Sequence, residues 1–116
     1  MAHDAHNVVV AGVDDADMAA CVARLAELGG GLCAVRDGAV LAEVPLPVAG
    51  LMSAADGPTV AAQLDALDAV LVSLGVELSE PMMALSFLAL SVIPELKLTD
   101  RGLVDVGRGA LIPFAV

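Results

Sequence analysis

The triple glycine at residues 29–31 most constrains the fold, because the periodicity of the sequence changes there. Before it, apolar residues recur at the spacing of a helix, at Met18, Cys21, Val22, Leu25 and Leu28. After it come two apolar runs separated by Asp37-Gly38, a step typical of a tight hairpin turn. The glycines therefore predict the end of a helix, followed directly by a β-hairpin.

Helix and strand patterns alternate along the rest of the chain. Residues 8–13 (VVVAGV) are mostly β-branched and nearly all apolar, which predicts a strand buried on both faces. The other expected elements are a helix from residue 57 that Gly75 ends, a helix from residue 81 that Pro94 ends, strands at residues 96–98 and 103–105, and an edge strand at residues 111–116.

This order predicts an α/β (α+β) fold, a two-layer sandwich with a mixed β-sheet and two to three helices. The length of 116 residues is close to the commonest domain size, and we see no linker and no repeat. We therefore expect residues 1–116 to form a single domain.

Charge and composition argue against several partners. The net charge is −10, and Phe87 and Phe114 are the only aromatic residues besides the two histidines. Phosphate binding needs clustered Lys and Arg, and base stacking needs aromatic rings, so we expect no nucleic-acid partner. The longest apolar run, residues 82–94, is shorter than the roughly 18–20 residues of a membrane span. We expect no membrane partner and a soluble, cytoplasmic protein.

The mean hydropathy of +0.87 is high for a small independent domain. Residues 82–90 (MMALSFLAL) are apolar almost all round. Part of this surface is therefore expected to be covered by another domain or by a second copy of the chain.

Cys21 and Cys33 do not form a CxxC pair and lie among apolar neighbours, so we expect two buried free thiols. A reactive or metal-binding role for these cysteines stays open as an alternative.

The stretch HDAHN at residues 3–7 holds both histidines of the chain and admits three interpretations. A metal site would need further ligands, and the remaining acids are scattered. A histidine–aspartate dyad is chemically sound, but adjacent side chains rarely face each other. We favour a polar loop in which Asp4 or Asn7 satisfies backbone groups. The candidate site residues are His3, Asp4, His6 and Asn7, and no complete catalytic set is visible.

Four blocks of the sequence together resemble one family: AHDAHNVVVAG, RLAELGGGLCAV, LAEVPLPVAGLMS and MALSFLALSVIPELKLTDRGLVDV. They look like the C-terminal domain of the adenine deaminases of the amidohydrolase superfamily, over residues 2–106. The resemblance implies an enzyme that hydrolyses adenine to hypoxanthine and ammonia. It also implies a manganese or iron centre in a (β/α)-barrel that precedes this domain, where a metal-bound water attacks the purine.

A barrel takes about 200–250 residues, so this chain cannot contain it. The metal-ligand motifs of the family have no counterpart here, and we expect no cofactor in this chain. Ala5 stands where the family usually has serine, and Ser91 where it usually has proline. In the parent enzyme HDAHN would lie at the seam between domains, so we expect its polar residues to edge the contact with an amidohydrolase-type barrel, as a domain or as a separate chain.

The start of the sequence, Met1-Ala2 directly before this motif, is what we expect of an excised or free-standing domain. Two alternatives stay open. One is a free-standing binder with a purine-sized pocket between the sheet and the turn at residues 50–52. The other is a homo-oligomeric structural module. We expect the chain alone to be inactive.

Overall fold

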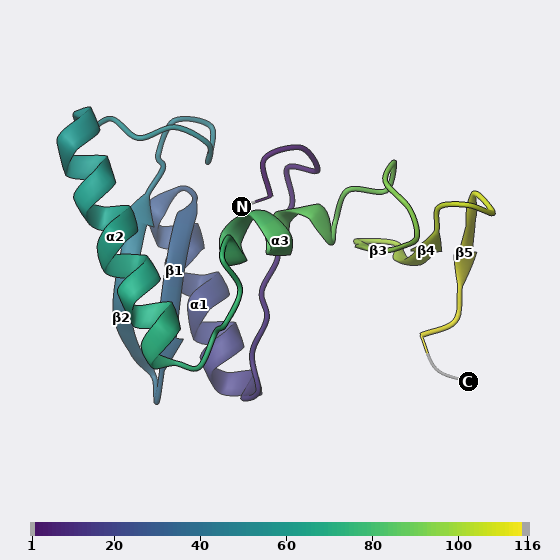
Figure 1. Ribbon diagram of the computed structural model, residues 1–116, viewed down its shortest axis with the longest axis horizontal. Helices are drawn as coiled ribbons and strands as arrows, with labels where there is room; N and C mark the ends of the chain where they lie inside the picture. The colour runs from purple at the N-terminus through teal and green to yellow at the C-terminus, as the bar shows by residue number, and fades with distance from the viewer. Residues whose placement is uncertain (1, 115–116) are drawn as a thin grey trace. The chain divides into compact units, whose positions relative to one another are not determined.

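The computed structural model describes residues 2–114, which belong to two compact units. The first unit comprises residues 10–79, and the second comprises residues 2–9 and the chain from residue 80 onward. The first unit contains α1 (Asp15–Leu28), β1 (Gly31–Arg36), β2 (Ala39–Pro45) and α2 (Gly57–Ser73) (Figure 1). The second contains α3 (Pro81–Phe87), β3 (Leu96–Thr99), β4 (Gly102–Asp105) and β5 (Ala110–Ile112). The predicted α+β class is confirmed, whereas the single domain stays a prediction.

Helix α1 begins and ends at the residues that the sequence marks. The carboxylate of Asp14 caps its start by accepting a hydrogen bond from the Asp17 N–H at 2.9 Å. Gly29 ends it with a φ of 73°, in the left-handed region that favours glycine. The other two glycines are required by close approach, because a Cβ on Gly30 would overlap the backbone of Gly50 and one on Gly31 would overlap the carbonyl oxygen of Val44.

The hairpin is tied to α1 at its tip. Asp37 and Gly38 both have positive φ, 53° and 75°, as a two-residue hairpin turn of the type I′ class requires. The carboxylate of Asp17 accepts hydrogen bonds from the N–H groups of Asp37, at 2.9 Å, and Gly38, at 2.7 Å. One side chain in the first turn of α1 therefore holds the hairpin turn.

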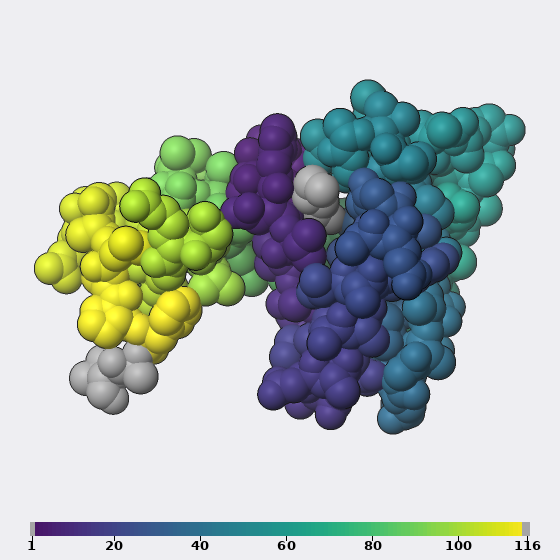
Figure 2. Space-filling model, turned by 180° about the vertical axis from the view of Figure 1, so that it is seen from behind, coloured from purple at the N-terminus to yellow at the C-terminus, as the bar shows by residue number. Residues whose placement is uncertain are grey.

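The two faces of the hairpin have different neighbours. Cys33 and Glu43 are paired across β1 and β2 and face α1, where their side chains contact Cys21 and Arg24. The alternate residues Ala34 and Val44 point to the opposite face and are buried, and α2 packs against both strands. The hairpin therefore lies between the two helices. Figure 2 shows the indigo atoms of α1 directly against the blue atoms of the hairpin.

The core of the first unit is built around α2. Asp56 caps this helix by accepting a hydrogen bond from the Thr59 N–H at 2.9 Å. Hydrogen bonding by Thr59, through its side chain first and then its N–H, lowers the pKa of the Asp56 carboxyl. Leu67 on α2 and Val44 on β2 are the largest fully buried side chains among the described residues. Apart from Cys21, the buried hydrophobic side chains described in this unit are aliphatic, in line with the scarcity of aromatic residues.

The second unit is a short helix followed by a three-stranded antiparallel meander in the order β3-β4-β5. The N–H of Leu98 on β3 donates to the carbonyl of Leu88, just after α3, at 2.7 Å. This unit has little core of its own, since only Ala2 and Ala89 are buried among its described hydrophobic residues. β5 is the predicted edge strand, although it ends before Pro113, and residues 115–116 lie outside the described residues.

Two expectations about the strands are corrected. Residues 8–13 form no strand, because no described segment pairs with them, and Val8 and Val13 are exposed rather than buried. The mixed sheet is replaced by two separate sheets, both antiparallel, because each consists of neighbours joined by tight turns. The two-layer arrangement is replaced in the first unit by a hairpin covered on both faces. Within residues 2–114, every helix is too short or too polar to cross a membrane.

Candidate functional site

HDAHN forms a loop closed by its own backbone. The N–H of Ala2 donates to the carbonyl of Asn7 at 2.8 Å, and the N–H of His6 donates to the carbonyl of Ala2 at 2.9 Å. His6 adopts a φ of 54°, which a residue other than glycine adopts only in a tight turn. The backbone groups therefore satisfy one another, and the loop does not depend on the side chains of Asp4 or Asn7 to do so.

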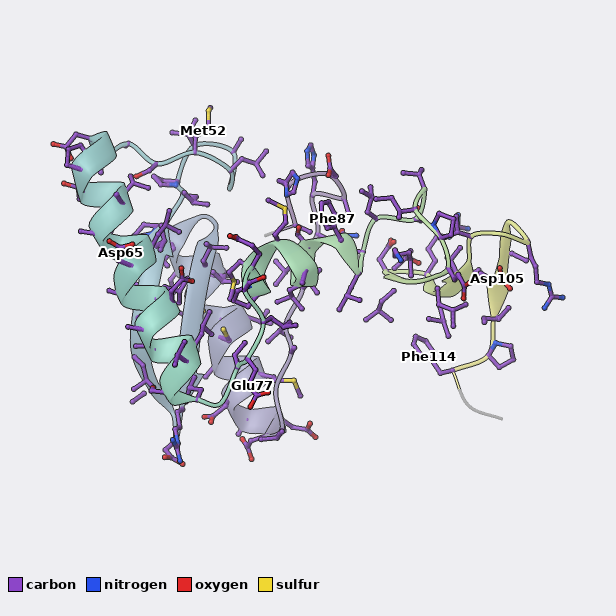
Figure 3. All side chains as sticks on the ribbon, in the orientation of Figure 1. Met52, Asp65, Glu77, Phe87, Asp105 and Phe114 are labelled. Atoms are coloured by element: carbon purple, nitrogen blue, oxygen red, sulfur yellow. The ribbon has the colours of Figure 1, made fainter. Side chains whose placement is uncertain are left out.

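His3 and Asp4 face each other despite being adjacent in the sequence. Nε2 of His3 lies 3.1 Å from Oδ2 of Asp4, and both side chains are about half exposed, at 48% and 49%. The His3 ring also meets Phe87 of α3 edge to face, with ring centroids 6.2 Å apart (Figure 3). The sequence gives no signal for this contact, because Phe87 lies far along the chain.

His6 does not join this pair. It is exposed, and the described residues show no side-chain partner for it. Within residues 2–114, no three His, Cys, Asp or Glu residues come together in a group that could hold a metal ion. Because a general acid or base acts best in a protected site, a half-exposed pair with no third group can position a proton but cannot exclude water.

The strongest polar cluster lies elsewhere, on the face of the hairpin toward α1. Nε and Nη2 of Arg24 each donate to one carboxylate oxygen of Glu43, at 2.7 and 2.9 Å. Nη1 of the same guanidinium donates to Glu27 at 2.9 Å. These hydrogen bonds hold the pKa of the Glu43 carboxyl below its usual value and raise the pKa of Arg24.

This cluster was missed at the level of sequence. The spacing of Arg24 and Glu27 on one helix face is a visible signal, but Glu43 reaches them only once the hairpin forms. A shallow, open depression lies beside the cluster, lined by Arg24 and residues 40–43. Glu43 already accepts hydrogen bonds from Nε and Nη2 of Arg24, which are the donors that a bound anion would need. The cluster therefore joins α1 to the hairpin rather than binding a ligand.

The two cysteines also meet on this face. Sγ of Cys21 on α1 lies 2.6 Å from Sγ of Cys33 on β1. Both are free thiols, as expected, although Cys33 is only partly buried. Burial, followed by the hydrogen bond with Cys21, raises the pKa of the Cys33 thiol to about 12.

The turn at residues 50–52, where the sequence left a purine-sized pocket open, exposes one large apolar side chain. Met52 is 59% exposed and points away from its loop (Figure 3). The purine-binding alternative at this turn stays a prediction.

The family model of the adenine deaminase C-terminal domain matches residues 1–110. Among curated relatives, the chain is 51% identical over 114 residues to an adenine deaminase of Oleidesulfovibrio alaskensis, covering 98% of the chain and 20% of the relative. It is 56% identical over 106 residues to one of Desulfatibacillum aliphaticivorans, covering 91% and 19%. It is 54% identical over 112 residues to one of Brucella anthropi, covering 97% and 20%. The chain therefore spans about a fifth of the length of the curated relatives it matches.

Proposed function

Because this chain belongs to the adenine deaminase C-terminal domain family, we propose that it is the accessory domain of an adenine deaminase. Water and adenine would give hypoxanthine and ammonia in a catalytic part outside this chain. The observation that carries the proposal is the match over nearly all of this chain to only about a fifth of proteins named adenine deaminase. The proposal implies a cytoplasmic enzyme of purine metabolism.

The chemistry is assigned to a metal-dependent barrel of the amidohydrolase type. Manganese or iron would supply an activated water there. The described residues of this chain do not fit such a metal, since no group of three ligating side chains exists among them. We therefore give none of them a step in the reaction.

The second unit is the proposed contact surface for the catalytic part. Its apolar segment, residues 82–98, exposes seven large side chains: Met83, Phe87, Leu88, Val92, Ile93, Leu96 and Leu98. No charged residue occurs between Pro81 and Pro94, and the fully buried centre of a protein interface is depleted in charge. Among its described residues this unit buries only two alanines, so it gains little stability alone. The large remainder of the enzyme would then cover its apolar surface.

The HDAHN loop supplies the polar edge of this surface in our proposal. His3 contacts Phe87, one of the exposed residues of the apolar segment, and keeps its own ring half exposed. His3, Asp4, His6 and Asn7 would then form a rim of hydrogen-bonding groups beside an apolar centre, a usual interface pattern. Replacing His3 and His6 together by Ala should lower thermal stability or turnover of the whole enzyme, and no change in either would contradict this role.

A chimera tests the proposed function directly. We would replace the matching segment of the Brucella anthropi relative by this chain and measure ammonia release from adenine with added manganese. The intact chimera should be active. Changing Leu88 and Val92 to Asp should lower activity by about tenfold or more, since buried charge disrupts an apolar contact.

Val72→Asp in α2 is the matched control, because Val72 is 69% exposed but belongs to the first unit. This variant should stay as active as the intact chimera. Ammonia release by the chain alone, or full activity after deletion of the segment, would overturn the proposal. Dimerisation of the isolated chain that the Leu88 and Val92 changes abolish would instead support a homo-oligomeric module.

A further inference from the structure

The thiols of Cys21 and Cys33 are placed for a reaction that the proposed function does not use. Their Sγ atoms are 2.6 Å apart, and each also lies within 3.6 Å of the carbonyl oxygen of the other residue. A disulfide requires sulfur atoms about 2.05 Å apart on side chains that point at each other. The pair meets the second condition because α1 and β1 are already packed together at this point.

We propose that Cys21 and Cys33 form a reversible disulfide, and that this pair is a redox-sensitive modification site joining α1 to the hairpin. The two residues differ in access, since Cys21 is 9% exposed and Cys33 is only partly buried. Cys33 is therefore the residue that meets an oxidant, and Cys21 is the residue that resolves the intermediate.

The oxidant is a low-molecular-weight disulfide such as oxidised glutathione. The Cys33 thiolate attacks one sulfur of that disulfide, forming a mixed disulfide and releasing one small thiol. The Cys21 thiolate then attacks the Cys33 sulfur, forming the internal bond and releasing the second small thiol. The protons of the two cysteines end on the two released thiols, the cysteines are oxidised and the small disulfide is reduced.

The burial of Cys33 should slow oxidation of the pair. Because only the thiolate is nucleophilic, the burial of Cys33 slows the first attack. We therefore expect weak oxidants to react slowly with Cys33. Once Cys33 has reacted, the internal disulfide should close fast, because the sulfur of Cys21 is already in contact. The mixed disulfide should not accumulate.

The bond would stabilise the first unit. It closes the chain between residues 21 and 33, and closing a loop of this size restricts the unfolded ensemble. We expect the melting temperature of the chain to rise by about 10 °C on oxidation. Addition of dithiothreitol should reverse the rise.

The test is oxidation of the 116-residue chain with oxidised glutathione under native conditions. Titratable thiols should fall from two to none, the mass should drop by two hydrogen atoms, and a non-reducing peptide map should join residues 21 and 33. Stable glutathione adducts, covalent dimers or unchanged thiols would each overturn the proposal.

Two control variants separate the bond from other effects of oxidation. The melting temperatures of the Cys33→Ser and Cys21→Ser variants should not rise on oxidation. Cys33→Ser changes the more accessible residue and is the safer variant if Cys21→Ser fails to fold. A rise in either variant equal to that of the parent chain would contradict the assignment. The result is independent of the proposed function, because no readout involves adenine.

Discussion

The two units of the chain are built differently, although both combine helices with antiparallel strands. The first unit has buried Leu67 and Val44, two helices with capping carboxylates, and side-chain hydrogen bonds from α1 to the hairpin. The second unit buries only two alanines in its described part and begins α3 without a side-chain cap. The first unit therefore contains the interactions that stabilise it, whereas the second exposes apolar surface suited to an external partner. Four predictions test this contrast.

Removal of core volume should have the largest effect. Leu67→Ala should lower the free energy of unfolding by about 2–5 kcal/mol, because Leu67 is completely buried. Leu88→Ala in the second unit should cost less than about 1 kcal/mol in the isolated chain, since Leu88 is 49% exposed. Chemical denaturation followed by circular dichroism measures both. Equal losses would remove the contrast between the units.

The second-largest loss of stability is expected where a substitution forces two close backbone segments apart. Gly30→Ala should cost about 2–3 kcal/mol, because it combines a φ of 118° with overlap on Gly50. Gly109→Ala in the second unit is the matched control, with a φ of 61° and open space around it, and should cost about 1 kcal/mol. Thermal melts of the two variants would reveal the order, and a milder effect at Gly30 would show that the backbone at Gly50 can move away from Gly30.

Helix capping should give a smaller difference. Asp14→Ala should lower the stability of the chain by about 1 kcal/mol, because the Asp17 N–H loses its acceptor. Glu80→Ala before α3 should change it by less than about 0.5 kcal/mol, since the side chain of Glu80 makes no capping hydrogen bond in the described structure. Urea unfolding of each variant gives the comparison. A Glu80 effect as large as that of Asp14 would show that α3 depends on a cap after all.

The ion pair should give the smallest effect, and one that depends on pH. Arg24 lowers the pKa of Glu43 from its usual 4.5, so the ionised, paired carboxylate favours the folded state above that pH. The contribution should disappear as the pH falls through the lowered pKa, where Glu43 becomes protonated in both states. Glu43→Gln should therefore cost about 0.5–1 kcal/mol near neutral pH.

Melting curves of the parent chain and this variant over a range of pH measure the difference. The two curves should converge in acid. A gap that stays constant to low pH would mean that the Glu43 charge contributes nothing to stability.

Local signals predicted most of the fold. Asp14, the glycines at residues 29–31 and the Asp37-Gly38 turn act on their immediate neighbours, so their roles can be read without a partner segment. Residues 8–13 were predicted wrongly because a strand needs a neighbour to pair with, and composition does not reveal one.

The candidate site could be predicted only in part. The polar loop at residues 3–7 is present, but its contact with Phe87 joins two distant parts of the sequence. The pairing of Cys21 with Cys33, and of Arg24 with Glu43, requires the packing of α1 on the hairpin. Contacts within one element left a periodic signal, whereas contacts between elements left none.

The carboxylate of Asp17, which holds both amides of the hairpin turn, also makes the lengths of two segments depend on each other. From Asp17 to Gly29 the helix rises about 18 Å, and from Gly31 to Asp37 the strand advances about 20 Å. An insertion in α1 after Asp17, or in β1, would carry the Asp17 carboxylate out of reach of the amides of Asp37 and Gly38. Length changes in α1 should therefore be tolerated only with matching changes in the hairpin, and tolerated insertions should concentrate in the loop between β2 and α2.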